Sequence, residues 1–520
     1  MKVLHLSTVD FWGYGISAYR LHKRLQAKGI DSIMITMVKS TGDPSVKMVI
    51  FDPLDKNKFH VFDKVIPDTE TISNYMIEKW NNLLKMQVMP SEGELIFSSY
   101  DSVVNLEEII ELNNPDIIHI HWAPGLVDIE KAPIYFMNKN ICLTIYDMYP
   151  FSGGCHNEKC EGFKEECRQC YLLKKEELKK IANINFNIKK KSYDLLKLHV
   201  VASNKILKRK SEESKIFGVD NKIEVIYPGV PVEKFSKKNK KQIRKYLQLP
   251  IDKYILILAC SSLKNKRKNI NYLIEGLKSL KEKGKEFYFI IIGAYAEEIK
   301  KKLHFPIHTI GFVPYEEIMC WYYSASDLFL NPSIQINIPI SVLEAMACGL
   351  PVVSFNYGGI KEVISHKKNG YLAELYNMED FINGIKWILR NRENIKLELN
   401  SKKTIKHFFN LDIVTVEYIK LYEEILKNNI GKDRLKNKII KWGEIFFKNK
   451  DIEKSLLVFN KILEQYGDDA EVFNNIGVIY WEKGDYENAI KFFKKAYKLK
   501  PFLKEIRENY INALTLRGKK

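Results

Sequence analysis

Glu344 is the side chain whose type and position point most directly to chemistry. Residues 331–333, Asn-Pro-Ser, are turn residues at the end of a short apolar run, and Ser341 is placed to cap a helix that stops at Gly349. Residues 351–355 then return as a β-branched strand. A carboxylate one turn into such a helix, in a loop-rich crevice above parallel strands, suits a ligand that carries hydroxyls and phosphates.

A basic loop supplies the second set of candidate side chains. The strongly apolar run 254–259 predicts a strand, and the loop after it contains Lys264, Arg267 and Lys268 before a helix begins at Asn271. Other lysine runs in the chain have no such position, whereas this loop directly follows a strand. The placement favours binding of phosphate over a merely solvated loop.

The N-terminus has the order expected of the first unit of a nucleotide-binding-type fold. Residues 2–7 form an apolar strand, a loop with Gly13 and Gly15 follows, and a helix is predicted over about 17–28 before a strand at 31–37. A Gly-x-Gly at the first strand–helix turn lets the backbone approach a ligand. The same two glycines also serve where only a tight turn is needed.

Two further candidates lie where predicted strands end. His121 closes a strand that begins near residue 114, and Asp147 closes the strand 141–146. Strand ends of a doubly wound sheet are where site residues gather. Both remain open to a second interpretation, as loop residues with satisfied hydrogen bonds.

Four of the eight cysteines, Cys155, Cys160, Cys167 and Cys170, lie within sixteen residues. Their spacing is Cys-x4-Cys-x6-Cys-x2-Cys, and four thiolates can close a tetrahedral structural zinc site, with His156 able to replace one of them. Free thiols and transient disulfides are the alternatives. A catalytic zinc is not expected, because nothing leaves an open coordination position.

Composition limits the class of protein. The chain has 520 residues and a net charge of +18, with lysine spread along its whole length. That spread gives no concentrated basic face for nucleic acid, and it fits solvated helix faces or attraction to anionic lipid headgroups. No apolar run approaches the ~20 residues of a membrane span, and no signal peptide is indicated. We expect a cytoplasmic protein, with peripheral contact at the inner membrane surface as one option.

The C-terminal part repeats itself. A shift of 34 residues superposes Trp442 on Ile476, Gly443 on Gly477, Phe446 on Tyr480, Ser455 on Ala489 and Phe459 on Phe493. This is the tetratricopeptide period and pattern, with small residues where paired helices approach. A plain helical hairpin is the simpler alternative. Two and a half copies are marginal alone, so we expect them to dock on the rest of the chain or on another protomer, and to bind a protein partner or peptide.

The helix that carries Glu344 also carries a family resemblance. Residues 341–353, Ser-Val-Leu-Glu-Ala-Met-Ala-Cys-Gly-Leu-Pro-Val-Val, followed by Gly-Gly-Ile-Lys-Glu at 358–362, resemble the donor-site signature of retaining glycosyltransferases of family four, which have the GT-B fold. The segment from Asp147 to His156, with its downstream cysteines, resembles a subgroup associated with exopolysaccharide synthesis of the colanic-acid type. The resemblance implies an α/β fold of two doubly wound Rossmann-like domains facing a cleft.

Domain boundaries follow from the resemblance and the repeat. We expect an N-terminal acceptor domain over 1–227 with a Cys-rich loop at 147–172, a donor domain over 228–400, a crossover helix over 401–430, and tetratricopeptide repeats over 432–520.

The resemblance also implies roles. It gives Glu344 the ribose hydroxyls of a nucleotide-sugar donor and Lys268 the donor pyrophosphate, with Arg267 or Lys264 as a second charge. It implies donor contacts for Gly13 and Gly15, and the neighbouring Asn337 and Ser341 are expected beside them. Asp147 carries over from a His-Asp pair, whereas Tyr146 stands in place of the His. His121 is expected to contact the donor sugar or the acceptor, and catalysis requires no divalent metal.

One departure from the family pattern bears on activity. Ile336 stands where the family has an acidic residue that contacts the donor sugar, and Ile340 stands where relatives often have a polar residue. Gln335 or Asn337 can compensate, or the donor is a deoxy sugar. The expected function is transfer of a hexose or deoxyhexose, with retention, to a glycan, lipid-linked or protein acceptor. The alternatives are an inactive GT-B scaffold that recruits partners through its repeats and, less favoured, a sugar-nucleotide epimerase.

Overall fold

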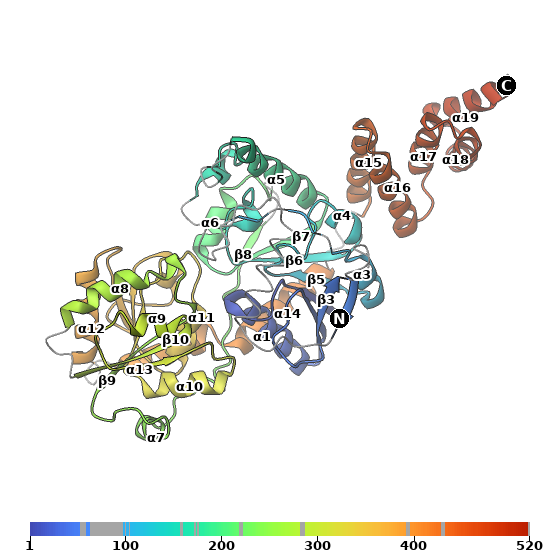
Figure 1. The fold of residues 1–520 in the computed structure, drawn as a ribbon. Coiled ribbons are helices and arrows are strands. Elements are labelled where there is room, and N and C mark those ends of the chain that lie inside the picture. The colour runs from blue at the N-terminus through green and yellow to red at the C-terminus, as the bar shows by residue number, and fades with distance from the viewer. Residues whose placement is uncertain are drawn as a thin grey trace.

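Two mostly parallel sheets form the body of the molecule, and a helical tail extends away from them (Figure 1). The structure is a computed structural model that describes residues 1–51, 59–62, 97–98, 100–102, 104–156, 160–170, 173, 176–217, 222–280, 286–391, 396–427 and 432–517. The statements below concern these residues.

The first sheet has eight strands in the order β4-β3-β2-β1-β5-β6-β7-β8, and every neighbouring pair is parallel except β3 with β4. The strands are β1 (Lys2–Leu6), β2 (Asp31–Thr36), β3 (Val46–Phe51), β4 (Phe59–Phe62), β5 (Ile117–Ile120), β6 (Asn140–Ile145), β7 (Lys197–Ala202) and β8 (Ile223–Val225). The central strands are buried along nearly their whole length, as expected when helices cover both faces of a parallel sheet.

Helices of the first domain connect these strands. They are α1 (Trp12–Ala27), α3 (Glu107–Asn113), α4 (Ala132–Tyr135), α5 (Glu176–Asp194) and α6 (Lys205–Glu212). α1 begins at Trp12, five residues earlier than predicted, so Gly13 and Gly15 lie in its first turn and not in a preceding loop. The turn into the helix is tight, because Trp12 itself has a φ of 59°.

The second sheet has six strands in the order β11-β10-β9-β12-β13-β14, all parallel. The strands are β9 (Tyr254–Ser262), β10 (Phe287–Ala294), β11 (Ile307–Ile310), β12 (Leu328–Asn331), β13 (Val352–Phe355) and β14 (Gly370–Ala373). The helices are α7 (Lys240–Tyr246), α8 (Ile270–Leu277), α9 (Ala296–Lys300), α10 (Glu316–Ala325), α11 (Ile340–Ala347), α12 (Met378–Asn391) and α13 (Leu397–Phe408).

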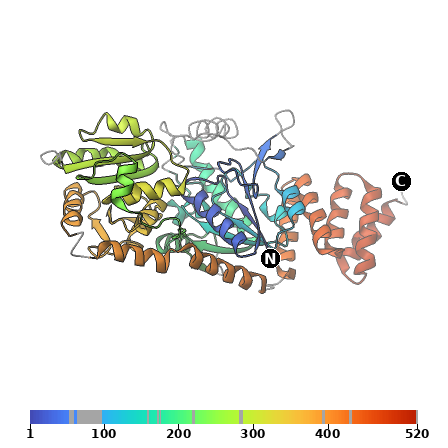
Figure 2. The same ribbon diagram turned by 90° about the horizontal axis from the view of Figure 1, so that it is seen from below.

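The chain crosses between the two domains twice, and the crossings lie side by side. Val230 donates its N–H to the Phe409 carbonyl at 2.8 Å, and Leu411 donates to the Val230 carbonyl at 2.9 Å. After the second crossing, α14 (Leu411–Lys427) returns along the first domain (Figure 2). It buries an apolar face that includes Tyr418 and Tyr422. Gly229 has no room for a side chain, because Leu411 packs against its Cα.

The tail consists of α15 (Lys432–Lys448), α16 (Ile452–Tyr466), α17 (Ala470–Glu482), α18 (Tyr486–Leu499) and α19 (Lys504–Arg517). Gly443 lies against the Phe459 ring and Gly477 against the Phe493 ring, so both glycines permit close helix pairs as the 34-residue pattern predicts. The first pair, α15 and α16, shares a hydrophobic cluster with Ile134 of the first domain. The repeats therefore dock on the body through their first pair.

None of the helices in the described part of the chain is both long enough and apolar enough to cross a bilayer.

Candidate functional site

α11 places Glu344 at the boundary between the two domains. The helix begins at Ile340 after Pro339, whose extended backbone forms the N-cap without a side-chain hydrogen bond. The prediction that Ser341 caps this helix is therefore wrong. Ser341 lies inside the first turn, where proline before it sets the direction of entry, and it is half-buried.

The Glu344 carboxylate faces the first domain and is held from both sides. Its Oε1 accepts a hydrogen bond from Arg20 Nη2 of α1 at 2.5 Å, and its Oε2 accepts one from the Tyr323 hydroxyl of α10 at 3.1 Å. The side chain is only 10% exposed. Burial raises the pKa of Glu344, and the charge and hydrogen bond of Arg20 oppose that rise. The carboxylate thus lies in the interdomain boundary, as a donor-binding role requires, but within a closed arrangement.

The basic loop lies beside the segment that leads into α11. Lys268 donates from Nζ to Gln335 Oε1 at 3.0 Å, and the Arg267 carbonyl accepts the Ile334 N–H at 2.8 Å. The positive charge of Arg267 also reaches Tyr14 of the first domain, where it lowers the pKa of a phenol whose burial strongly raises it. The structure thus brings the Lys268 side chain and the Arg267 backbone to the loop that precedes Glu344.

Ile336 has a different place from the one its sequence position suggests. Its side chain is 4% exposed and belongs to the hydrophobic core of the first domain, although the residue lies in the second. Its carbonyl accepts hydrogen bonds from Asn204 Nδ2 at 3.2 Å and from the Gly359 N–H at 2.8 Å. An apolar plug between domains thus replaces the expected acidic sugar contact. Asn337, the predicted compensating residue, is half-buried beside it.

Gly13 and Gly15 differ in what surrounds them, and so in what a side chain at each position would contact. A Cβ on Gly15 would lie 2.7 Å from the Val9 carbonyl oxygen, so only glycine allows α1 to start so close to its own strand end. A Cβ on Gly13 would meet only the Ile340 side chain, at 3.8 Å. Gly13 therefore faces the start of α11 across the domain boundary, and Gly15 serves a local turn.

Asp147 is engaged within the first domain. Its Oδ2 accepts from His156 Nδ1 at 2.6 Å and from Trp122 Nε1 at 2.9 Å, and its Oδ1 accepts the Tyr149 N–H at 2.9 Å. Burial opposes ionisation, but these partners hold the pKa of Asp147 below its ordinary value. His156 in turn pairs through Nε2 with Ser98 Oγ at 2.8 Å. All of these bonds lie inside one domain, which fits the alternative of a loop residue with satisfied hydrogen bonds, and a catalytic role for Asp147 stays a prediction.

His121 points into a buried layer of rings and not toward a ligand. Its Nε2 lies 2.9 Å from His5 Nδ1 and its Nδ1 lies 3.1 Å from the Tyr146 hydroxyl, while His119 pairs with the Tyr422 hydroxyl at 2.6 Å. Burial lowers the pKa of all three histidines, that of His121 to about 3, so they are neutral. Hydrogen bonds inside the layer use both ring nitrogens, which fits the alternative of a satisfied residue, and contact of His121 with sugar or acceptor stays a prediction.

The four clustered cysteines pack into the core of the first domain. All are reduced and at most 5% exposed, and no three of their sulfurs lie within 4.8 Å of one another. Cys167 Sγ accepts the Gly153 N–H at 3.1 Å, and a hydrogen bond with Cys155 lowers the pKa of Cys160 to about 7. The structure therefore gives the predicted zinc no assembled set of thiolate ligands from Cys155, Cys160, Cys167 and Cys170.

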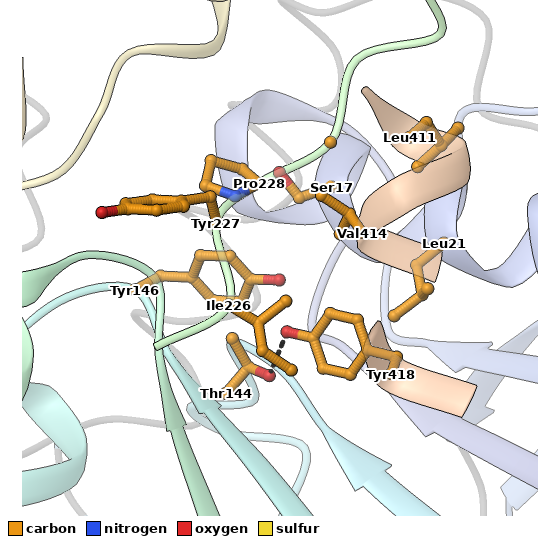
Figure 3. Close-up of a pocket in the computed structure, with 11 residues that line it drawn as sticks. Ser17, Leu21, Thr144, Tyr146, Ile226, Tyr227, Pro228, Leu411, Val414 and Tyr418 are labelled. Atoms are coloured by element: carbon orange, nitrogen blue, oxygen red, sulfur yellow. Dashed lines mark hydrogen bonds between the residues drawn. The ribbon is translucent and has the colours of Figure 1, made fainter. Parts of the chain in front are cut away.

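A small pocket lies elsewhere, where the first crossing passes between α1 and α14 (Figure 3). Hydroxyls of Ser17, Tyr146 and Tyr418 line it, and Tyr418 bonds to Thr144 Oγ1 at 3.0 Å. It has room for roughly one water molecule. This pocket is too small for a nucleotide sugar, so the candidate ligand site is the boundary around Glu344.

Sequence reasoning missed Arg20 and Trp122. Arg20 is 5% exposed on a helix whose neighbouring Leu21 marks the buried face, and a charged residue on such a face is a signal worth following. Nothing local, however, indicates partners 296 and 324 residues away. Trp122 immediately follows the predicted site residue His121, yet it is the tryptophan that contacts Asp147.

Comparison with known proteins assigns the second domain. The family model of glycosyl transferases group 1 matches residues 239–406, and a tetratricopeptide repeat model matches residues 470–502. The tetratricopeptide prediction is confirmed for residues 470–502, and α11 with Glu344 lies inside the glycosyl transferase match.

Individual relatives match only in part. The chain is 36% identical over 165 residues to the amylovoran biosynthesis glycosyltransferase AmsK of Erwinia amylovora, and 31% identical over 144 residues to an uncharacterized glycosyltransferase of Haemophilus influenzae. These matches span 29% and 26% of this chain, and 38% and 40% of the relatives' own length.

The fold is confirmed by solved structures. Anabaena HepE in complex with UDP-glucose superposes with a TM-score of 0.53, at 13% identity, over 82% of this chain and all of that one. The two sheet domains are therefore the predicted GT-B arrangement.

Proposed function

We propose that this chain is a retaining glycosyltransferase that moves a sugar from a nucleotide-diphosphate donor to an acceptor hydroxyl. One observation carries the proposal: α11 presents the Glu344 carboxylate to the opposite domain, within the region that matches the group 1 glycosyl transferases. Two hydroxyls of a ribose can be bound by one ionised carboxylate, since each oxygen accepts independently.

The chemistry assigned to the other side chains follows from their positions. Lys268 lies beside Gln335 at the entrance to α11, where an ammonium stabilises the charge that develops on a departing diphosphate. Closure of the two domains excludes water from the reacting centre. HepE was solved with UDP-glucose, and AmsK takes part in amylovoran biosynthesis, so a UDP-sugar donor and a polysaccharide or glycoconjugate product are the first to test.

Nucleotide binding by the full-length chain tests the proposal. Calorimetry with UDP, GDP and ADP identifies the base, and the matching nucleotide sugars follow. The Glu344→Gln substitution removes the charge from the ribose contact. It should lower the affinity for the nucleotide by about tenfold to a hundredfold, the effect of a lost charge-assisted hydrogen bond. Lys268→Ala should lower the affinity for the nucleoside diphosphate to a similar extent and leave the affinity for the nucleoside without phosphates unchanged.

Matched controls come from the same domain. Glu398 is a carboxylate of α13 held by Lys237 and Lys402, and Lys278 is an exposed lysine after α8 that pairs with Glu275 at 2.5 Å. Glu398→Gln and Lys278→Ala should leave nucleotide affinity within twofold. Absence of binding by the wild-type chain to all three nucleotides would refute the proposed donor site.

The buried Ile336 favours a second candidate, a GT-B scaffold without transfer activity. Its side chain occupies the first-domain core at the position where the family places an acidic sugar contact. A scaffold of this kind would recruit a protein through the tetratricopeptide repeats. Slow release of free sugar from the bound nucleotide sugar, measured by chromatography, separates the two candidates, because a scaffold binds the donor without cleaving it.

A further inference from the structure

Arg20 is the one side chain of α1 that reaches the carboxylate proposed to bind ribose. Its Nη2 donates to Glu344 Oε1 at 2.5 Å and its Nε donates to Glu316 Oε1 at 2.8 Å, so one guanidinium joins the first domain to two carboxylates of the second. The guanidinium also stacks 5.3 Å from the Phe235 ring centroid. Its Nη1 is buried and has no hydrogen-bond partner among the described residues.

The unpartnered Nη1 has a physical consequence. A buried N–H of a guanidinium without an acceptor costs free energy, and such groups are rare in native proteins unless a water, an ion or a functional role accounts for them. The neighbouring carboxylates already occupy the other two nitrogens. An oxygen-rich ligand that enters beside Glu344 is therefore positioned to accept from Nη1.

We propose that Arg20 is a positioning residue for nucleotide recognition: it fixes the Glu344 carboxylate across the domain boundary and donates its Nη1 N–H to the bound nucleotide. This inference rests on the proposed donor site. It adds a contribution from the first domain to a contact that the family motif places wholly in the second. Because Arg20 and Glu344 meet only when the domains are together, nucleotide affinity is coupled to closure.

Electrostatics gives the proposal a second readout. Burial raises the pKa of Glu344, Arg20 lowers it, and Glu316 raises it. Only the ionised carboxylate accepts from two ribose hydroxyls, so affinity should fall on the acid side as Glu344 becomes protonated. Removing Arg20 should move that acid limb to higher pH, and removing the charge of Glu316 should move it to lower pH.

Several titratable groups surround this cluster in the described part of the chain. Those that act on Glu344 or its partners are Tyr19 and Arg20 of α1, Lys234 and Lys238 of the first crossing, Glu316, Glu317, Cys320 and Tyr323 of α10, Cys348 after α11, and Lys402 of α13. Burial raises the pKa of Tyr323, and the hydrogen bond that Cys348 donates to Cys320 raises the pKa of Cys348, so both are neutral. A hydrogen bond with Cys348 lowers the pKa of Cys320 to about 7, so the measurements also need a Cys320→Ser background.

The test uses full-length protein and whichever of UDP, GDP and ADP binds the wild type. Calorimetry from pH 5 to 8 should show that Arg20→Gln weakens binding about tenfold or more and shifts the acid limb upward. Glu316→Gln should shift the limb downward with Arg20 still in place. Arg20→Lys should restore much of the pH profile but little of the affinity, because a point charge replaces the fork.

Arg24 supplies the matched control. It lies one turn further along α1, pairs with Glu233 and with Asp412 Oδ1 at 3.0 Å, and is 19% exposed. Arg24→Gln should leave affinity and pH profile unchanged. If Arg20→Gln does not fold, judged by its melting curve, Arg20→Lys and Glu316→Gln still decide the matter by the direction of their shifts.

The outcomes separate this inference from the proposed function. Loss of binding in Glu344→Gln together with an unchanged or stronger affinity and the same pH profile in Arg20→Gln would overturn the role of Arg20 and leave the donor site standing. If Glu316→Gln leaves the acid side of the affinity–pH profile unshifted, that result would likewise overturn the role of Arg20 and leave the donor site standing. No binding by the wild type would overturn both.

Discussion

The two sides of the domain boundary use polar side chains in opposite ways. In the first domain, Asp147 and His121 form their hydrogen bonds with neighbours from the same domain, such as His156 and His5. In the second domain, Glu344 takes its shortest bond from Arg20 of the other domain. Both sides carry titratable residues that sequence patterns mark as functional, and among these three Glu344 is directed across the boundary whereas Asp147 and His121 are not.

The difference shows what a buried charge does when its partners are local or distant. A closed network inside one domain is satisfied whether or not a ligand is present, so it stabilises the fold. A carboxylate whose main partner lies on another domain keeps its hydrogen bond only in one relative placement of the two domains. Its hydrogen bonding can therefore be coupled to ligand binding. The comparison predicts that substitutions in the first-domain network lower the stability of the fold. Substitutions at the second-domain side of the boundary should instead change ligand affinity or the contact between the domains.

Asp147→Ala should produce the largest loss of stability. It leaves His156 and the Trp122 N–H without their buried acceptor, and breaking a buried pair of this kind costs about 3–5 kcal/mol. We expect a clearly lower melting temperature and an unchanged nucleotide affinity per folded molecule. Urea unfolding followed by circular dichroism measures the first, and calorimetry measures the second.

The pH dependence of Asp147 has a definite sign. Its partners hold the folded pKa below the ordinary value, so its contribution to stability is present above the unfolded pKa and is lost as pH falls through the folded one. Asp147→Asn should therefore flatten the loss of stability in acid. Asp31, a carboxylate 61% exposed on β2, is the control, and its alanine variant should change neither property. A selective loss of nucleotide binding in Asp147→Ala would contradict the comparison.

Ile336→Glu should have the next largest effect. The substitution restores the acidic residue of the family pattern but places a charge in the core of the first domain, where an unpaired carboxylate costs a few kcal/mol. We expect a lower melting temperature without faster release of sugar from a nucleotide sugar. Ile336→Val, which removes one methyl group, should cost only about 1 kcal/mol. Faster turnover in Ile336→Glu would show that the side chain reaches the donor and that the apolar plug is not its role.

The sequence was sufficient to predict the helices and strands near the site but not the long-range contacts between their side chains. Apolar strands, the Glu344 helix and the 34-residue repeat all follow from local patterns, and each is present. Helix starts were misplaced at Trp12 and Pro339, because a positive φ at a tryptophan and an N-cap without a side-chain acceptor depart from usual capping chemistry.

Long-range partnerships lie beyond such reasoning for a physical reason. Glu344 and Arg20 are 324 residues apart, and only the packing of two domains brings them together. The same holds for Ile336, whose apolar type predicts burial but not burial in the other domain. Asp147 shows the converse, since its pairing with His156 nine residues later arises from one loop that the sequence had marked as functional.

Lys461→Met tests the comparison at a third place, the boundary between the tail and the first domain. Lys461 of α16 is 7% exposed and pairs with Glu107 at 2.7 Å and Glu111 at 2.9 Å of α3, as well as with Glu464 of its own helix at 3.0 Å. These carboxylates raise the pKa of Lys461, although burial opposes the rise. Removing the charge should weaken docking by about 1–3 kcal/mol while the body keeps its melting temperature.

Hydrogen exchange separates local release from global unfolding at this boundary. In Lys461→Met, amides of α15 and α16 should exchange faster, whereas those of β1 and β5 should not change. Lys454→Met is the control, because Lys454 meets Glu130 at 3.4 Å with its side chain 36% exposed and should contribute little. Faster exchange throughout the first sheet would mean that this cross-boundary charge stabilises the fold in the same way as Asp147. The distinction between closed networks and boundary contacts would then fail, since it requires that a contact between separately packed units can be lost while each unit stays folded.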